Sequence, residues 1–275
     1  MKKKQKWTVF SILGLLILLV FAAICIAPFI YMVIMSFTQS TTLMLHWSDI
    51  NFGDFTNFNY VLEKTGFIRA LTNSVIVVFC SCLFNCIIAS MAAYGFAKKK
   101  FPGNKMIFRM YLLTLMIPGQ VTIIPRFMLF KSMGLYNTLW SCILPFWFST
   151  TAIFMLRQFY IGLPNDLMEA AKIDGAGHFR IFLQVLMPLT KPAMITLVIL
   201  AFIGSWNEYL SPLIFITKQE KYTVAQAIRW YLLDELQRYD LTMAAATIAI
   251  VPVIILFISC QKYFVEGIAT SGVKG

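Results

Sequence analysis

The chain has 275 residues, of which 59% are hydrophobic and 13% are charged, and its mean hydropathy is +0.76. Soluble domains carry nearly twice that share of charged residues, about 25%. The composition therefore excludes an ordinary soluble enzyme, a disordered chain and a nucleic-acid-binding domain, in spite of a net charge of +11. It predicts an integral membrane protein.

Six apolar stretches are long enough to cross a hydrocarbon core, which takes about 20 residues in a helix. They are continuously apolar, whereas the strands of a membrane barrel alternate, so helices are expected. We predict an all-α polytopic membrane protein with one transmembrane domain over residues 1–275. The expected spans are Val9–Phe37, Leu71–Ala97, Met106–Phe130, Asn137–Gln158, Ala193–Thr217 and Leu241–Tyr263. The first is too long for a cleaved signal peptide and is expected to be retained.

The distribution of basic residues predicts the orientation of these spans. If the N-terminus is cytoplasmic, 15 of the 23 Lys and Arg residues fall in inner segments and 8 in outer ones. Cytoplasmic loops carry the excess of Lys and Arg in membrane proteins. Both termini are therefore expected in the cytoplasm, and the basic excess is expected to face the anionic lipid of the inner leaflet.

The cysteines and histidines give no support for a disulfide framework or a metal centre. All six cysteines lie inside apolar stretches, and the two histidines lie in loops on opposite sides. Cys82 and Cys86 share a helix face and could bind a metal, but packing between helices is favoured because no His or acid is near. Neither HExxH nor GxSxG is present, so no catalytic residue and no cofactor is predicted.

The inner loop over residues 163–192 has too regular a pattern to be a simple tether. Pro164 prevents a helix before it, and either Asn165 or Asp166 can be the N-cap of a new one. With Asp166 as N-cap, Glu169 occupies the N3 position of a capping box. Gly175 is expected to stop this helix in the left-handed conformation. A second amphipathic helix, closed by Pro188 and Pro192, should follow. Such a pair of helices could dock a partner protein or could simply pack on the underside of the bundle.

Three polar residues in the membrane are candidates for contact with a solute. Glu208 is the one carboxylate inside a predicted span, and Asn207 precedes it. Intramembrane ionisable residues are functional candidates by default, but Glu208 could instead bond to a neighbouring helix or face outer water. Gln120 follows Pro118 and Gly119 in the third span, where the helix could break to line a cavity or could simply be kinked.

The outer segment 219–240 contains an amphipathic stretch, Ala225–Leu236. A short interfacial helix is expected there. It could dock a partner on the outer side or lie on the membrane surface without one.

Several motifs resemble those of binding-protein-dependent ABC transporter permeases. Their EAA loop is matched by Glu169-Ala170-Ala171, then Asp174-Gly175-Ala176 and Pro188, with Met187 where leucine is expected. The resemblance is to the carbohydrate-uptake branch, and within it to the second, six-helix permease subunit. It extends to Phe96–Asn104, Met116–Gln120, Ser205–Leu213 and Gly267–Gly275, and it is weakest over Gln39–Gly66.

The resemblance implies a permease for a sugar or oligosaccharide in a bacterial-type plasma (inner) membrane. It implies a heterodimer with a second permease subunit, two ATPase subunits that bind ATP and Mg, and an extracytoplasmic solute-binding protein. The sequence has no GxxxxGK[ST] phosphate loop, so ATP hydrolysis would belong to another chain. ATPase docking would fall on Glu169, Ala170, Ala171, Asp174, Gly175 and Gly177. A permease for glycerol phosphate or another polar solute, and an ATP-independent secondary carrier, are the alternatives.

Overall fold

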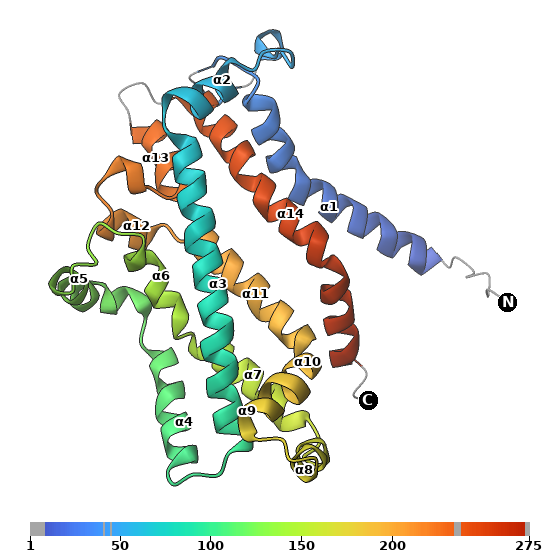
Figure 1. The fold of residues 1–275 in the computed structure, drawn as a ribbon. Helices are drawn as coiled ribbons and strands as arrows, with labels where there is room; N and C mark the ends of the chain where they lie inside the picture. Colours follow the sequence, from blue (N-terminus) through green and yellow to red (C-terminus); the bar gives the residue numbers. More distant parts are fainter. Residues whose placement is uncertain (1–8, 41, 45, 234–237, 273–275) are drawn as a thin grey trace. The chain divides into compact units, whose positions relative to one another are not determined.

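The computed structural model describes residues 9–40, 42–44, 46–233 and 238–272, and these are helical or irregular throughout, without a strand. The lysines before Val9, the acids Asp234 and Glu235, and the last three residues of the tail lie outside this range. Figure 1 shows the long helices α1, α3 and α14 and the shorter ones that connect them. The described chain is thus all-α, as predicted.

Contacts divide the described residues into two compact units. The first consists of the residues up to Phe67 together with Ile228–Ile250, and the second of Ile68–Ala227 with the residues from Val251 onward.

The first unit contains α1 (Val9–Met35), a short 3₁₀ turn (Trp47–Asp49), and α2 (Thr56–Asn59), which runs on as a π-helical turn (Tyr60–Lys64). It also holds most of α13 (Val224–Leu233) and the start of α14 (Tyr239–Gly272). The best membrane window of α1 has mean hydropathy 3.1 and contains no buried residue. Such a helix is suited to contact lipid or another chain along its whole length.

The second unit is built around α3 (Phe67–Lys98) and also contains α14 from Val251 onward; its other helices are shorter. They are α4 (Asn104–Leu113), α5 (Ile123–Ser132), α6 (Trp140–Trp147), α7 (Thr150–Gly162), α8 (Asp166–Ile173), α9 (His178–Arg180), α10 (Met187–Leu189), α11 (Lys191–Trp206) and α12 (Leu210–Phe215). A π-helical turn, Ile181–Leu186, joins α9 to α10. Short 3₁₀ turns cover Thr114–Met116, Gly119–Thr122 and Gln219–Lys221.

Three of the predicted spans are broken rather than continuous. The third bends by 93° between α4 and α5, which is a true break and not a gentle kink. Pro118 and Gly119 explain it, because proline removes a backbone donor and glycine disfavours a helix. The fourth separates at Phe148 and Ser149 into α6 and α7, and the fifth separates at residues 207–209 into α11 and α12.

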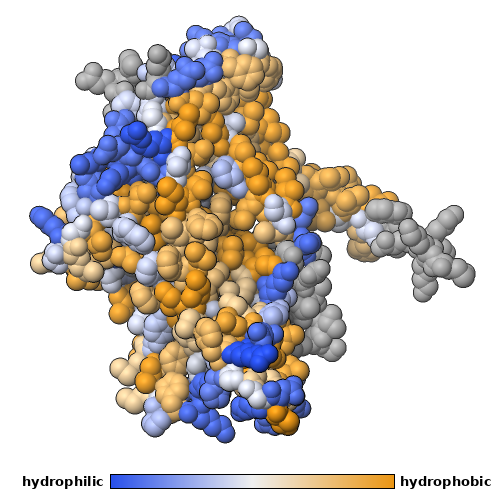
Figure 2. All heavy atoms as spheres, in the orientation of Figure 1, coloured by the Kyte–Doolittle hydropathy of each residue, from blue (hydrophilic) through white to orange (hydrophobic). Residues whose placement is uncertain are grey.

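The number of candidate spans depends on two strongly bent pairs of helices. They are α4 with α5, and His178–Leu189 with α11. Three described helices are long and apolar enough to cross a bilayer, and five candidates result if each bent pair is one span. In Figure 2 most of the spheres on the visible face are hydrophobic residues. The described chain is therefore an all-helical membrane protein with three to five candidate spans.

A buried apolar cluster, here called the inner cluster, holds one end of the second unit together. It draws on α3, α4, α7, the π-helical turn and α11. Its members are Ala89, Ala93, Phe108, Ala152, Ile153, Leu156, Tyr160, Ile181, Phe182, Leu186, Ala193 and Leu197. Since close-packed interiors do not deform continuously, elements that share this cluster are expected to move together.

Candidate functional site

The loop over residues 163–192 folds as a short helix followed by a second helical segment. Helix α8 begins at Asp166, with Asn165 as its N-cap and no side-chain cap. The predicted capping box with Asp166 as N-cap is therefore wrong. The reason is that Asn165 already has helical backbone angles, and its side-chain oxygen accepts a hydrogen bond from Lys98 Nζ at 2.8 Å.

Gly175 ends α8 as the sequence predicts. Its φ is +77°, in the left-handed region that favours glycine. Ala176 N–H donates to the carbonyl of Ala171 at 2.9 Å, and Gly175 N–H donates to that of Lys172 at 3.0 Å. These two bonds form a Schellman motif, which satisfies the last carbonyls of the helix. The turn after α8 is therefore fixed by backbone geometry.

The second helical segment ends where the sequence predicts. It runs from His178 to Leu189 and stops at Thr190, between Pro188 and Pro192, with a bend of 79° to α11. Pro192 lies in the first turn of α11, where proline is tolerated because the first backbone N–H groups of a helix have no intrahelical partner.

One side of α8 packs against the body of the second unit. Met168 and Ala171, together with Ala176 after the turn, are partly buried against the inner cluster. Lys98, at the end of α3, holds the start of the loop, because its ammonium also donates to the carbonyl of Leu163 at 2.7 Å. Figure 1 shows α8 at the end of the unit where α3 turns into α4.

The other side of α8 is exposed and mixes apolar with charged residues, Asp166, Glu169 and Lys172 among them. Ile173 is 87% exposed and Leu167 is 40% exposed. Of the predicted docking residues, Ala171 alone is half-buried; the rest are exposed, namely Glu169, Ala170, Asp174, Gly175 and Gly177. A helix that packs on the core with one side, and exposes apolar residues and the small Ala170 on the other, is suited to receive another protein.

Two of the three predicted solute-contact residues, Glu208 and Asn207, bond to the nearby backbone. Glu208 Oε1 accepts a hydrogen bond from Ser211 N–H at 2.7 Å and so caps the start of α12. Asn207 Nδ2 donates to the carbonyl of Ile203 at 3.0 Å, at the end of α11. Gln120 is exposed in the break between α4 and α5. Glu208 and Asn207 therefore lie at one helix break and Gln120 at another, and contact with a solute stays a prediction for all three.

Sequence reasoning missed a polar residue at the break between α6 and α7. Asn85, in the middle of α3 and 2% exposed, donates from Nδ2 to the carbonyl of Phe146 at 2.5 Å. It lines a cavity of about 270 Å³ whose wall includes Ser149 and Thr151. The signal in the sequence was weak, because Asn85 is one of several polar residues within α3.

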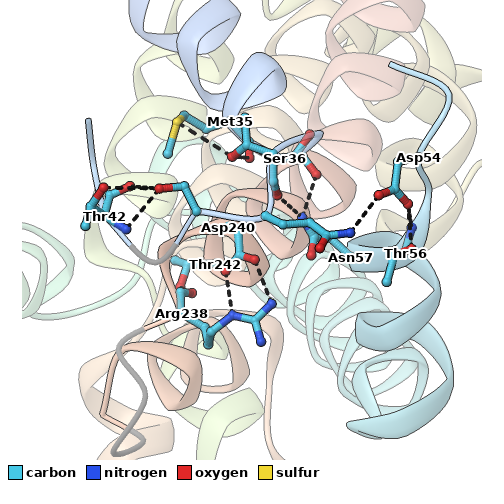
Figure 3. A network of polar contacts seen from close by, with 12 residues as sticks. Met35, Ser36, Thr42, Asp54, Thr56, Asn57, Arg238, Asp240 and Thr242 are labelled. Atoms are coloured by element: carbon cyan, nitrogen blue, oxygen red, sulfur yellow. Dashed lines mark hydrogen bonds and ion pairs between the residues drawn. The ribbon is translucent and has the colours of Figure 1, made fainter. Parts of the chain in front are cut away.

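Polar contacts of the first unit fix the segment after α1 (Figure 3). Asn57 Nδ2 donates to the carbonyls of Ser36 at 3.1 Å and Thr38 at 2.6 Å. Arg238 and Asp240 form a bidentate pair, with the closer N–O distance 2.7 Å. This hydrogen bonding by Asp240 raises the pKa of the Arg238 guanidinium. No cluster of metal-ligating side chains occurs among the described residues, Cys82 and Cys86 included.

Comparison with known proteins gives the family. Residues 85–270 match the family described as binding-protein-dependent transport system inner membrane component. The chain belongs to this family. The matched range contains α8 and both candidate regions in the membrane, whereas the divergent segment Gln39–Gly66 lies outside it.

Relatives of the same kind cover nearly the whole chain. The arabinooligosaccharides transport system permease protein AraQ of Halalkalibacterium halodurans is 34% identical over 92% of this chain and 93% of its own. The sn-glycerol-3-phosphate transport system permease protein UgpE of Brucella abortus is 31% identical over 94% and 95%. A crystal structure of a bacterial ABC transporter involved in the import of the acidic polysaccharide alginate shares the fold, with TM-score 0.81, 24% identity, and coverage of 93% and 96%.

The family match confirms the resemblance drawn from the EAA motif. The chain is an inner-membrane permease of an ABC transport system that depends on a binding protein, and it is a transport component and not an enzyme. The role of the individual loop residues stays a prediction.

Proposed function

We propose that this chain is one of two permease subunits of an ATP-driven oligosaccharide importer. The observation that carries the proposal is α8, whose inner side packs on the inner cluster while its outer side is exposed. The arabinooligosaccharide permease, which covers 92% of this chain, supports the substrate class. The second permease, two ATPases and a solute-binding protein would complete the importer.

The exposed face of α8 would receive the ATPase. Glu169, Ala170 and Asp174 would form the contact, while Gly175 and Gly177 would allow the turn behind it. Closure of the ATPase pair on ATP would push α8, and Met168 and Ala171 would pass that movement to the inner cluster. Alternating access needs a two-state element of this kind, biased by its partner.

We further propose six spans with both termini in the cytoplasm. The fourth span would combine α6 and α7. Near the break between them, the backbone carbonyl of Phe146 accepts a hydrogen bond from Asn85. A membrane-impermeant thiol reagent tests the orientation. It should label Ser132→Cys and spare His178→Cys in cells whose outer face is accessible; the reverse pattern would reject this orientation.

Copurification from gently solubilised membranes tests the importer assignment. A second permease and an ATPase should accompany the chain, and Glu169→Lys should reduce ATPase retention roughly tenfold without reducing membrane insertion, because it reverses a charge at the contact. Glu220→Lys, the same reversal at an exposed acid of the predicted outer side, is the matched control. Normal retention by Glu169→Lys would reject the docking site.

A transport assay tests the substrate class. Vesicles carrying the complex and its binding protein should accumulate a labelled arabinooligosaccharide, and excess glycerol 3-phosphate should not compete. Competition by glycerol 3-phosphate would favour the function named for the Brucella relative. Uptake by the chain alone, without ATP, would instead identify a secondary carrier.

A further inference from the structure

A basic groove lies at the end of α3, in the second unit. It has a volume of about 580 Å³ and is lined by the last turn of α3, the turn that follows it, the start of α4 and one residue of α7. Four cationic side chains contribute to its wall: Lys99, Lys100, Lys105 and Arg157. We refer to it as the inner groove.

The charges of the inner groove are not neutralised within the described part of the chain. No acidic residue lines the groove, and the ion pair that the described residues form, Arg238 with Asp240, belongs to the first unit. Lys172 on α8 is near enough to Lys99 to act on it, and burial together with this like charge lowers the pKa of Lys99. Both observations indicate a cluster of positive charge that an anion would stabilise.

Two of the cations are held in place by aromatic rings. The Arg157 guanidinium lies 4.1 Å from the centre of the Phe108 ring, and its Nε donates to the carbonyl of Phe96 at 3.4 Å. The Lys99 ammonium lies 5.4 Å from the centre of the Tyr94 ring. Cation–π contacts of this kind restrict the side chains without neutralising them. The groove is therefore partly preorganised for an anion.

Apolar side chains border the same groove. Phe101 is 40% exposed and Met106 is 67% exposed, and both line it. The groove begins where the apolar stretch of α3 ends. A small soluble anion would make no apolar contact with exposed aromatic and thioether groups. A phospholipid has both a phosphate for the basic side chains and acyl chains for the apolar ones.

We propose that the inner groove binds the phosphate of an anionic phospholipid from the inner leaflet, with Lys100 and Lys105 as its principal charge contacts. The acyl chains would lie against Phe101 and Met106. The assignment to the inner leaflet rests on the orientation proposed above. Basic pockets between membrane helices on the cytoplasmic side suit such headgroups, and each basic residue near the surface contributes on the order of 1 kcal/mol.

The test measures the affinity of the full-length chain for fluorescent phosphatidylglycerol in phosphatidylcholine nanodiscs. The double variant Lys100→Gln, Lys105→Gln should bind it roughly 10- to 30-fold more weakly, the loss expected for two such charges. Both side chains are exposed, so the variant should fold normally. The matched control is Lys131→Gln, Lys218→Gln, which removes two exposed charges from the predicted outer side and should bind like wild type.

Three results would overturn the proposal. One is equal affinity in the two double variants. Another is displacement of the lipid by inorganic phosphate at comparable concentration, which would indicate a soluble-anion site. The third is loss of ATPase copurification in Lys100→Gln, Lys105→Gln with lipid affinity unchanged, which would indicate a protein contact. If the wild-type chain copurified with no ATPase, the proposed function would be rejected. The lipid proposal would still be decided by the affinities of the two double variants.

Discussion

Two connecting regions of this chain are held in different ways. The loop over residues 163–192 is predicted to face the cytoplasm and is here called the inner loop. It packs on the inner cluster through Met168, Ala171 and Ala176. The segment that follows α1 is predicted to lie outside and is here called the outer segment. It is fixed by local contacts, which are the hydrogen bonds of Asn57 to its backbone and the ring contacts among Phe37, Phe52, Phe55 and Phe58. Apolar packing against several helices joins a loop to their movements, whereas local contacts only shape it. In the proposed importer the ATPase would push on the inner loop. That loop therefore has to be packed against the helices that move, whereas the outer segment does not.

Truncation of Leu156 should give the largest loss of stability, because it removes apolar contacts from the inner cluster, on which the inner loop packs. Leu156 is fully buried in the inner cluster, and Leu→Ala substitutions at such positions cost about 2–5 kcal/mol. Thermal unfolding of the purified chain should show a marked drop in stability for Leu156→Ala. Leu200→Ala, at a 53% exposed position on α11, is the matched control and should change little. Equal losses of stability in the two variants would show that the inner cluster contributes no more to stability than an exposed position of α11.

Removal of the Asn57 side chain should have the next largest effect, confined to the outer segment. Asn57 is 4% exposed, and Asn57→Ala leaves two backbone carbonyls without their donor, at a cost of roughly 1–3 kcal/mol. The same unfolding assay measures it, with exposed Asn59→Ala as control. Transport per folded molecule should stay normal. If transport per folded molecule fell together with the stability of Asn57→Ala, the outer segment would also take part in the transport movement.

Gly175→Val should alter function more than stability. A β-branched residue at φ +77° is strained by roughly 1–2 kcal/mol, so the turn after α8 should shift. Transport is expected to fall about tenfold while ATPase activity continues. Gly162→Val, at a glycine without positive φ and with open space around it, is the matched control. Normal transport by Gly175→Val would contradict the lever role of the loop.

The smallest expected effect concerns pH and the outer segment. Hydrogen bonds from Thr56 and then Gln39 lower the pKa of the Asp54 carboxyl below its ordinary 3.8. A depressed pKa gives a contribution that is present above 3.8 and is lost as the pH falls through the folded-state value. Stability of wild type relative to Asp54→Asn should therefore decline between neutral pH and pH of about 3. A constant difference would show that the carboxylate charge contributes nothing.

Local signals account for what the sequence could predict. Gly175 could be placed because a helix stop in the left-handed conformation has a strong residue preference, and the break near Pro118 follows from the same kind of rule. The break at Ser149 is harder to place, since Pro145 lies inside α6 and the helix continues past it to Trp147. The side chain that bonds to the backbone there, Asn85, is 61 residues away from Phe146 in the sequence. Lys98 was missed for a similar reason, because its partners Leu163 and Asn165 are distant in sequence.

The break between α4 and α5 has a consequence for the life of the subunit in the cell. Residues 113–121 are exposed throughout, and Met116 is 77% exposed. Irregular backbone cannot face lipid tails, because its polar groups would have no partner there. The segment must therefore be covered by protein or by water. If the second permease of the proposed importer covers it, a copy made without that partner would leave this backbone facing lipid, and the break would make the subunit depend on its partner for a stable place in the membrane.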